Sequence, residues 1–359
     1  MFVYVGTYSV RESGGIYQYS LDISSGALRL VNSFTSLENP TYLEINHSGE
    51  NLYAVSEVQD PYGAVSSFSI HPVTGELKHL NNHPVSGGSP CHLSVDDTDS
   101  FIIGANYDGG SAFVLLIDEY GKLGHATDFV QHKGMSLDSE RQEGPHAHSA
   151  TLDLSNRYAF VADLGIDKIM IYKFDSEKGT LSASKQSSID IKAGAGPRHL
   201  KFHPNGKYAY VINELDSTVT SFTYDQGEGE LKLNGTVSTL PPGIDLPAVV
   251  TRGLKGNNWC ADIHISPSGT KLYGSNRGHD SIAIFDIDSE NGKLTYMGYE
   301  PSGGETPRGF VIDQTGKILI VANQDSDNIT TFFIDIHTGF ITPTGHSVEV
   351  PSPVCLKIK

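Results

Sequence analysis

Apolar and polar residues alternate over short stretches along the whole chain, and one stretch shows the unit that recurs. In residues 196–215, GPRHLKFHPNGKYAYVINEL, Leu200 and Phe202 alternate with polar neighbours. Residues 204–206 (PNG) are a tight-turn signal, and Tyr208 to Ile212 is a continuous apolar run. An alternating stretch, a turn and an apolar return run together predict an antiparallel β-hairpin.

The two strands of this predicted hairpin bring distant residues to one edge. Because the strands are antiparallel, Arg198 at the start of the first and Glu214 at the end of the second lie at the same edge. The same hairpin recurs along the chain, and in six complete copies the two corresponding positions are 16 residues apart. These pairs are Thr41 with Glu57, Cys91 with Tyr107, His148 with Leu164, Arg198 with Glu214, Ala261 with Arg277, and Arg308 with Gln324.

Each return strand leads into two further alternating segments, such as GIYQYSLDISSGALRL and DSIAIFDIDSENGKLTYM. Four strands per unit, roughly 50 residues per unit and seven units predict an all-β, seven-bladed β-propeller. We expect residues 1–359 to form a single domain. Residues 353–359 supply only a first strand and the N-terminus begins at a second strand, so the two chain ends should complete one blade and close the ring. A solenoid or a pair of sandwiches is the alternative.

The composition narrows the possible partners and compartment. A formal net charge of −17 disfavours nucleic acid and anionic membrane surfaces as partners. No run of 18 apolar residues is present, so no transmembrane span is expected, and the N-terminal MFVYVGTYS looks like a strand rather than a signal peptide. Three widely spaced cysteines, Cys91, Cys260 and Cys355, argue against a disulfide framework and fit the cytoplasm. The oligomeric state stays open.

Two segments lengthen the connections at the face where first strands begin. Residues 131–144 (QHKGMSLDSERQEG) precede the fourth hairpin, and residues 237–258, rich in Pro, Gly and Leu, precede the sixth. Long loops that converge on one rim of a repeat fold are more often functional than not. We therefore expect both loops to border a site.

In a propeller the first strand of each blade lines the central channel, so the hairpin ends should form rings of side chains around one mouth. Arg198, Arg277 and Arg308 gather there in an otherwise acidic chain. The planar guanidinium binds carboxylate or phosphate through two hydrogen bonds. We expect these arginines to bind an anion; three structural ion pairs are the alternative.

His148, in the block GPHAHS, is the candidate general acid or base because the pKa of an unperturbed histidine lies close to neutral. Glu214 and Glu57 are candidates for orienting it or for activating water. His146, two residues earlier, could share a metal with His148. No carboxylate or cysteine at metal-ligand spacing reinforces that possibility, so we expect neither a metal nor another cofactor.

The rings contain several more polar side chains that could contact a ligand. For His199 and His264 the alternative is a hydrogen-bonded position in the core, and Asp262 is equally suited to capping its strand. Cys91 near the mouth is either reactive or simply buried. Because Arg, His and Glu outnumber aromatic anchors, the rings favour chemistry on a small anion over docking of a protein. The candidate ligand-contacting residues are Arg308, His146, His199, Glu57, Asp262, His264 and Tyr107.

Four blocks of the sequence resemble the signature blocks of a known family. These are EGPHAHS, GPRHLKFHPNGKYAYVINEL, WCADIHISPSGTKLYGSNR and TPRGFVIDQTGK, and the family is the propeller-type 6-phosphogluconolactonases, which are similar to fungal carboxy-muconate lactonising enzymes. The resemblance covers essentially all seven blades. It implies a metal-free lactonase of the pentose phosphate pathway. It also implies an active site of one His, one Glu and two Arg, by motif His148, Glu214, Arg198 and Arg277.

The rings and the resemblance together lead to one functional expectation. It is hydrolysis of 6-phospho-D-glucono-1,5-lactone, a small anionic sugar lactone, to 6-phospho-D-gluconate. Arg198 and Arg277, with Arg308, would hold the phosphate and polarise the lactone carbonyl, while His148 or Glu214 would take a proton from water. The alternatives are a lactonase or lactonising cycloisomerase for another anionic lactone, and a non-catalytic propeller that binds a small anion or a partner.

Overall fold

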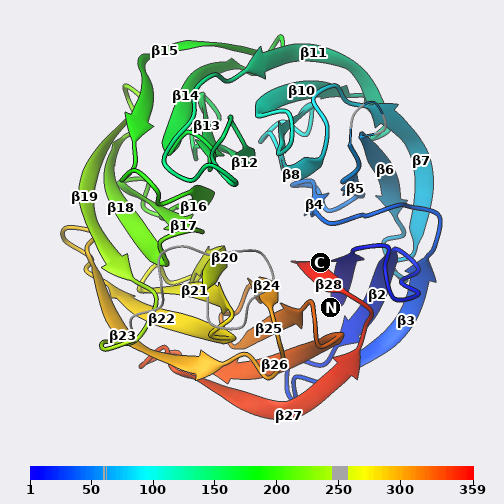
Figure 1. Cartoon of the computed structure of the whole chain (residues 1–359). Helices are drawn as coiled ribbons and strands as arrows, with labels where there is room; N and C mark the ends of the chain where they lie inside the picture. Colours follow the sequence, from blue (N-terminus) through cyan, green and yellow to red (C-terminus); the bar gives the residue numbers. More distant parts are fainter. Residues whose placement is uncertain (60, 62, 245–257) are drawn as a thin grey trace.

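The computed structural model describes residues 1–59, 61, 63–244 and 258–359. Within these ranges every regular element is a β-strand. The strands form seven four-stranded antiparallel sheets around a central channel (Figure 1). This arrangement is a seven-bladed β-propeller, as the repeat predicts. The described part of the chain contains no helix long and apolar enough to cross a membrane.

The two inner strands of each blade are the predicted hairpins. The innermost strands, around the channel, are β28 (Pro353–Ile358), β4 (Leu43–Ile45), β8 (Pro90–Val95), β12 (Ala147–Leu152), β16 (Pro197–Phe202), β20 (Trp259–Ile265) and β24 (Pro307–Ile312). The second strands are β1 (Phe2–Thr7), β5 (Asn51–Ser56), β9 (Phe101–Asn106), β13 (Tyr158–Asp163), β17 (Tyr208–Asn213), β21 (Lys271–Arg277) and β25 (Ile318–Asn323).

The two outer strands complete each blade. The third strands are β2 (Ile16–Leu21), β6 (Ala64–Ile70), β10 (Ser111–Ile117), β14 (Lys168–Asp175), β18 (Thr218–Asp225), β22 (Ser281–Ile287) and β26 (Asn328–Ile334). The outermost strands are β3 (Leu28–Phe34), β7 (Leu77–Pro84), β11 (Leu123–Gln131), β15 (Thr180–Asp190), β19 (Glu230–Ser238), β23 (Leu294–Pro301) and β27 (Ile341–Glu349).

Both chain ends belong to the same blade, in which the strand order is β28-β1-β2-β3. The last strand pairs antiparallel with the first, from Val3 opposite Ile358 to Gly6 opposite Cys355. Figure 1 shows the N- and C-termini close together at the channel. The predicted closure is thus confirmed, and the inner edge of β1 is paired with β28 instead of being left open.

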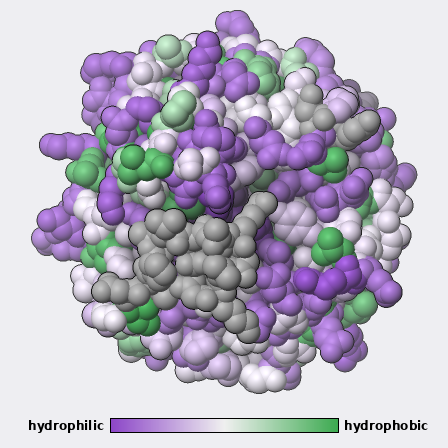
Figure 2. Space-filling model, viewed as in Figure 1, coloured by the Kyte–Doolittle hydropathy of each residue, from purple (hydrophilic) through white to green (hydrophobic). Residues whose placement is uncertain are grey.

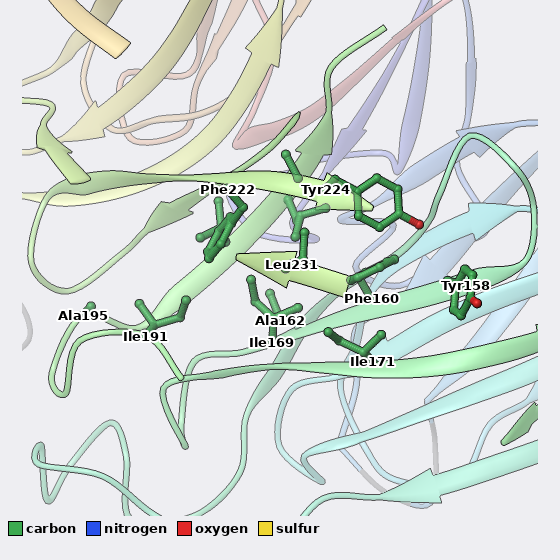
Figure 3. Packing of buried hydrophobic residues seen from close by; sticks show 13 residues of the cluster. Tyr158, Phe160, Ala162, Ile169, Ile171, Ile191, Ala195, Phe222, Tyr224 and Leu231 are labelled. Atoms are coloured by element: carbon green, nitrogen blue, oxygen red, sulfur yellow. The ribbon is translucent and has the colours of Figure 1, made fainter. Parts of the chain in front are cut away.

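The core consists of apolar layers between neighbouring blades. Figure 3 shows one such layer, in which Phe160 and Ile171 of the β12–β15 blade face Phe222 and Leu231 of the β16–β19 blade. A blade in the ring is covered on both faces, and strand β17 is buried along its whole length. This two-sided burial explains why the second strands are continuous apolar runs rather than alternating ones.

Polar side chains dominate the outside of the ring. The outermost strands are the most exposed strands of each blade; β3, for example, is exposed along its central five residues. On the face seen in Figure 2, hydrophilic residues predominate and hydrophobic residues lie scattered.

In several blades, a tyrosine of the second strand donates a hydrogen bond to the neighbouring blade. In each case the phenol donates to the carbonyl of a glycine in the turn between the third and fourth strands. The bonds are Tyr4 to Gly75 at 2.6 Å, Tyr53 to Gly121 at 3.3 Å, Tyr210 to Gly292 at 2.9 Å and Tyr273 to Gly339 at 2.8 Å. Gly292 has a φ of +69°, and a Cβ there would lie 2.4 Å from the ring of Tyr208. Glycine is therefore required both for the backbone conformation and for the close approach of the blades.

Removing one of these phenols should weaken the contact between two blades. We expect Tyr210→Phe to lower the free energy of unfolding by about 1–2 kcal/mol, because the buried carbonyl of Gly292 loses its donor. Urea denaturation followed by circular dichroism measures the change. Tyr296→Phe is the matched control, since the Tyr296 hydroxyl is buried without a hydrogen-bond partner among the described residues. An equal loss of stability in both variants would contradict the assigned role of the Tyr210 bond.

Candidate active site

Several innermost strands share one irregularity at the mouth of the channel. In the pairing of β16 with β17 the register shifts between Pro197 and His199, so Arg198 is an extra residue without a ladder partner. Strands β12 and β24 have the same shift at His148 and Arg308. A β-bulge re-aims the side chain of its extra residue, and all three side chains line the channel.

Above these bulges lies a cavity of about 500 Å³, which we call the mouth cavity. It contains six of the residues predicted from the sequence. Its lining residues are Tyr8, Glu57, Gln59, Ser89, Cys91, Tyr107, Asp108, Arg141, His148, Glu214, Trp259, Arg277, Arg308 and Gln324. Below it, a small chamber of about 30 Å³ continues down the channel and shares Glu57, Cys91, His148 and Arg308 with the mouth cavity. We call this second space the inner chamber.

Glu214 is a buried carboxylate held by three guanidinium groups. Its Oε2 lies 3.0 Å from Nε of Arg198 and 2.9 Å from Nη2 of Arg277, and its Oε1 lies 2.5 Å from Nη2 of Arg141. Burial by itself would raise the pKa of Glu214, but Arg277, Arg141 and Arg198 together hold it well below its ordinary value. Glu214 is therefore ionised at neutral pH. The hairpin spacing predicted its pairing with Arg198, and that prediction is confirmed.

Two of these arginines are fixed by main-chain carbonyls. Nη1 of Arg198 donates to the carbonyl of Ala261 and lies 3.1 Å from Nε2 of His199. Arg277 donates from Nε to the carbonyl of Trp259 at 3.3 Å and from Nη2 to that of Cys260 at 2.8 Å. Burial lowers the pKa of Arg277 to about 10, so it remains charged at neutral pH. These bonds leave both guanidinium groups little freedom to turn.

His148 lines both the mouth cavity and the inner chamber. Its Nδ1 is buried without a hydrogen-bond partner among the described residues. Burial of the ring, followed by the charge of Arg198, lowers the pKa of His148 well below 6.5. The imidazole is therefore neutral at neutral pH and able to accept a proton.

Arg308 and Glu57 meet on another side of the mouth through a tyrosine. The hydroxyl of Tyr8 donates to Oε1 of Glu57 at 3.1 Å, and Nη2 of Arg308 donates to the same hydroxyl at 3.0 Å. Thr41 donates to the other carboxylate oxygen. The Arg308 guanidinium also lies over the Tyr8 ring, 5.4 Å from its centroid. Glu57 is thus well supplied with hydrogen bonds, while Arg308 faces the cavity.

His199, Asp262 and His264, predicted as ligand contacts, lie around the inner chamber and do not line the mouth cavity. Asp262 accepts from Nδ1 of His199 at 2.9 Å and from Nε2 of His264 at 3.1 Å. Since His199 uses its other nitrogen for Arg198, the chain of hydrogen bonds ends at that arginine. These three residues hold Arg198 from below, which matches the hydrogen-bonded alternative for the two histidines.

His146, predicted to contact the ligand, also lies outside the mouth cavity. It precedes β12, and its ring stacks on Tyr107 with centroids 4.6 Å apart. Its nitrogens lie 3.0 Å from the carbonyl oxygen of Tyr107 and 3.2 Å from Glu143. It therefore orients Tyr107, which does line the cavity. In the described ranges, no group of three or more His, Cys, Asp and Glu residues is placed to hold a metal ion.

Sequence reasoning missed Arg141 and Trp259, both of which line the mouth cavity. Arg141 comes from the loop 131–144, and besides Glu214 it donates to the hydroxyl of Tyr107 at 3.1 Å. Its guanidinium lies 5.4 Å from the centroid of the Trp259 ring. Two signals were available: a rare arginine inside an unusually long loop, and the only tryptophan of the chain beside a ring position.

The other long loop and Cys91 complete the predicted features of the mouth. Of residues 237–258, positions 245–257 lie outside the described residues.

The Cys91 thiol is buried and donates to main-chain carbonyls, including that of His148 at 3.5 Å. Burial raises the pKa of Cys91 well above 9, so the thiol is protonated at neutral pH. The structure thus supports the buried rather than the reactive interpretation.

Comparison with known proteins places this geometry in a class. A family described as "Lactonase, 7-bladed beta-propeller" matches residues 2–358, which defines the class as propellers that open lactone rings. The chain belongs to this lactonase family, as its signature blocks indicated, and it is therefore a lactone hydrolase rather than a non-catalytic propeller.

Named relatives extend over nearly the whole chain. The 6-phosphogluconolactonase of Bacillus subtilis (strain 168) is 38% identical over 354 residues, which cover 99% of this chain and 97% of that protein. The crystal structure of a Bacteroides fragilis protein, provisionally named a 6-phosphogluconolactonase, matches with a TM-score of 0.90 and 34% identity, covering 99% and 97% of the two chains. The periplasmic gluconolactonase of Pseudomonas aeruginosa matches with a TM-score of 0.88 and 29% identity, covering 99% and 98%.

The buried histidine beside Arg198 should make the protein sensitive to acid. Burial, with Arg198, lowers the pKa of His199 to about 3, so between that value and about 6.5 the unfolded chain binds a proton that the folded chain does not. Stability therefore falls as the pH decreases through this range. We expect His199→Gln to reduce the loss between about pH 6.5 and about pH 5 by about 2 kcal/mol relative to wild type.

Urea denaturation at several pH values measures this difference. Tyr210→Phe is the control, because it lowers stability without removing a group that titrates in this acidic range: burial raises the pKa of Tyr210 above its ordinary value of 10. If His199→Gln retains the full pH dependence of wild type, then His199 is not held neutral in the folded protein.

Proposed function

We propose that this protein hydrolyses 6-phospho-D-glucono-1,5-lactone to 6-phospho-D-gluconate, without a metal, in the pentose phosphate pathway. The observation that carries the proposal is the convergence of Arg141, Arg277 and Arg308 with His148 and Glu214 in one cavity of an acidic chain. Guanidinium groups suit a phosphate and a developing oxyanion. The name of the Bacillus subtilis relative supports the same substrate.

The protonation of His148 and the hydrogen-bond partners of Glu214 indicate a different role for each residue. His148 is neutral, whereas both oxygens of Glu214 are occupied by guanidiniums in this structure. We assign the first proton transfer to His148, and a charge-balancing role next to it to Glu214. Water attacks the lactone carbonyl carbon while its proton passes to His148. The bond between this carbon and the ring oxygen then breaks, and the proton returns to that oxygen as it becomes a hydroxyl.

The arginines have two different roles: one positions Glu214, and the others contact the substrate. Arg198 is only 3% exposed, it does not line the mouth cavity, and its Nε and Nη1 donate to Glu214, His199 and Ala261. It therefore fixes Glu214, and Arg277 and Arg308 are the groups placed to hold the carbonyl oxygen as charge develops on it. The expectation that Arg198 itself binds phosphate receives no support from this arrangement.

The proposed compartment is the cytoplasm. The three cysteines are buried and free, and no disulfide links them. Unpaired thiols of this kind persist in a reducing compartment, which is also where a phosphorylated sugar lactone would be available as substrate.

Unphosphorylated glucono-1,5-lactone is a second candidate substrate. The observation that favours it is the full-length structural match to the Pseudomonas aeruginosa gluconolactonase. The two substrates share the lactone ring and differ in the phosphate, so their relative rates of hydrolysis separate the two candidates.

The proposed function predicts rapid hydrolysis of freshly prepared 6-phosphogluconolactone in the presence of EDTA. After correction for spontaneous ring opening, we expect His148→Ala to lower kcat by roughly 10²–10⁴-fold, the usual contribution of a positioned general base. Coupled spectrophotometric assay of the 6-phosphogluconate formed measures both effects. His125→Ala, which removes an exposed histidine of β11, is the control for replacing a histidine.

Each possible failure has its own meaning. Hydrolysis that stops when EDTA is added would overturn metal independence. A rate no higher than background with the phosphorylated lactone, together with rapid hydrolysis of another lactone, would overturn the substrate. Equal activity of His148→Ala and wild type would remove His148 from the proton transfer.

A further inference from the structure

The three arginines on Glu214 differ in how they are anchored. Arg198 and Arg277 donate to main-chain carbonyls that the strands hold in place. Among the described residues, the Arg141 side chain donates only to two other side chains, Glu214 and Tyr107. It is also the most exposed of the three, at 17% of its side chain against 3% and 8%. Arg141 is thus the guanidinium that can move away from Glu214 without losing a hydrogen bond to a main-chain carbonyl.

The backbone around Arg141 is held firmly, although it belongs to a long loop. The neighbouring Gln142 is fully buried and donates from its side chain to the carbonyl of Leu164 at 2.8 Å. The Gln142 amide donates to the carbonyl of Asp138 at 2.7 Å. At the start of the loop, Nδ1 of His132 lies 2.6 Å from the buried carboxylate of Asp163. The side chain of Arg141 can therefore rotate from a fixed base at the cavity wall.

We propose that Arg141 is the specificity-determining residue that binds the phosphate of the substrate and, in turning to it, releases Oε1 of Glu214. This inference rests on the proposed function. A phosphate dianion offers three oxygens to a guanidinium and competes well with a single carboxylate oxygen. Glu214 keeps Arg198 and Arg277 on Oε2 during the exchange, so its buried charge stays paired.

The exchange would couple recognition of the phosphate to the chemistry. While Arg141 is paired with Glu214, both carboxylate oxygens of Glu214 have guanidinium partners. Once Oε1 is free, it can accept a hydrogen bond from the attacking water beside His148. A lactone without a phosphate presents no anion to Arg141, so Glu214 remains fully occupied and the lactone reacts more slowly. Arg141 would therefore favour phosphorylated over unphosphorylated substrates at the reaction step as well as in binding.

The first test is substrate selectivity. We expect Arg141→Gln to lower the ratio of kcat/KM for 6-phosphogluconolactone to kcat/KM for glucono-1,5-lactone by about 10- to 100-fold, the effect of losing a charged hydrogen-bond pair. Arg141→Lys, which keeps the charge but not the planar fork, should give an intermediate ratio. Arg157→Gln, which removes an arginine whose guanidinium reaches the exposed Gln226 carbonyl at 2.7 Å, is the matched control.

The second test observes Arg141 directly and needs no turnover. Trp259 is the only tryptophan in the chain, and the Arg141 guanidinium lies against it. Titration with the stable product 6-phosphogluconate should produce a saturable change in tryptophan fluorescence in wild type and Arg157→Gln. We expect this change to be lost in Arg141→Gln, while gluconate, which lacks the phosphate, should produce a much smaller change in wild type.

The outcomes separate this inference from the proposed function. If wild type hydrolyses the phosphorylated lactone but Arg141→Gln leaves the selectivity ratio unchanged, the role of Arg141 is refuted and the proposed function stands. The same holds if Arg141→Gln shows the full fluorescence change. If wild type hydrolyses neither lactone, the proposed function fails, whatever the fluorescence titration shows. Melting curves of each variant confirm that it is folded before it is compared.

Discussion

The site depends on one buried carboxylate. Burial and the neighbouring Arg308 lower the pKa of Arg198, and burial lowers that of Arg277 to about 10. Like charges this close in a channel largely shielded from water would be costly without a counter-charge. Glu214 supplies it, because its two oxygens bind three guanidiniums at 2.5–3.0 Å. The arginines can therefore stay charged and close together, which is what the proposed anionic substrate requires.

The closed ring brings these groups together and holds them still. Closure makes the innermost strands begin around one mouth, and the bulge at their start directs Arg198, His148 and Arg308 to the channel. Below the mouth, the hydrogen bonds among His199, Asp262 and Arg198 occupy the inner chamber. A rigid frame of this kind preorganises charge for a transition state. Because the strand residues are fixed, a change of side-chain position on substrate binding is expected outside the strands, and Arg141 lies in a loop.

The loop residues explain why part of the site was not predictable. Arg141 reaches Glu214 through the folded path of residues 132–146, whose turns are set by pairs such as His132 with Asp163 and Gln142 with Leu164. No periodicity in the sequence indicates such a path. His146 and His199 are a different case: both were predicted to contact the ligand, and they lie two residues from His148 and one residue from Arg198. The bulge and the end of the strand give nearby residues different surroundings, so His148 lines the mouth cavity whereas His146 and His199 lie outside it.

By itself the sequence determined the fold and the partners Arg198 and Glu214. A hairpin has a fixed register, and the bulge recurs with the repeat, so a constant spacing predicts which side chains meet across two paired strands. The apolar return strands likewise predicted burial on both faces, and the split blade predicted closure. Only the tertiary structure decided that Glu214 has three guanidinium partners, that Arg141 is the least anchored of them, and that His199 and Asp262 lie behind Arg198. These contacts join blades and a loop that are far apart in the chain, and their geometry depends on side-chain packing around the whole channel rather than on local pattern.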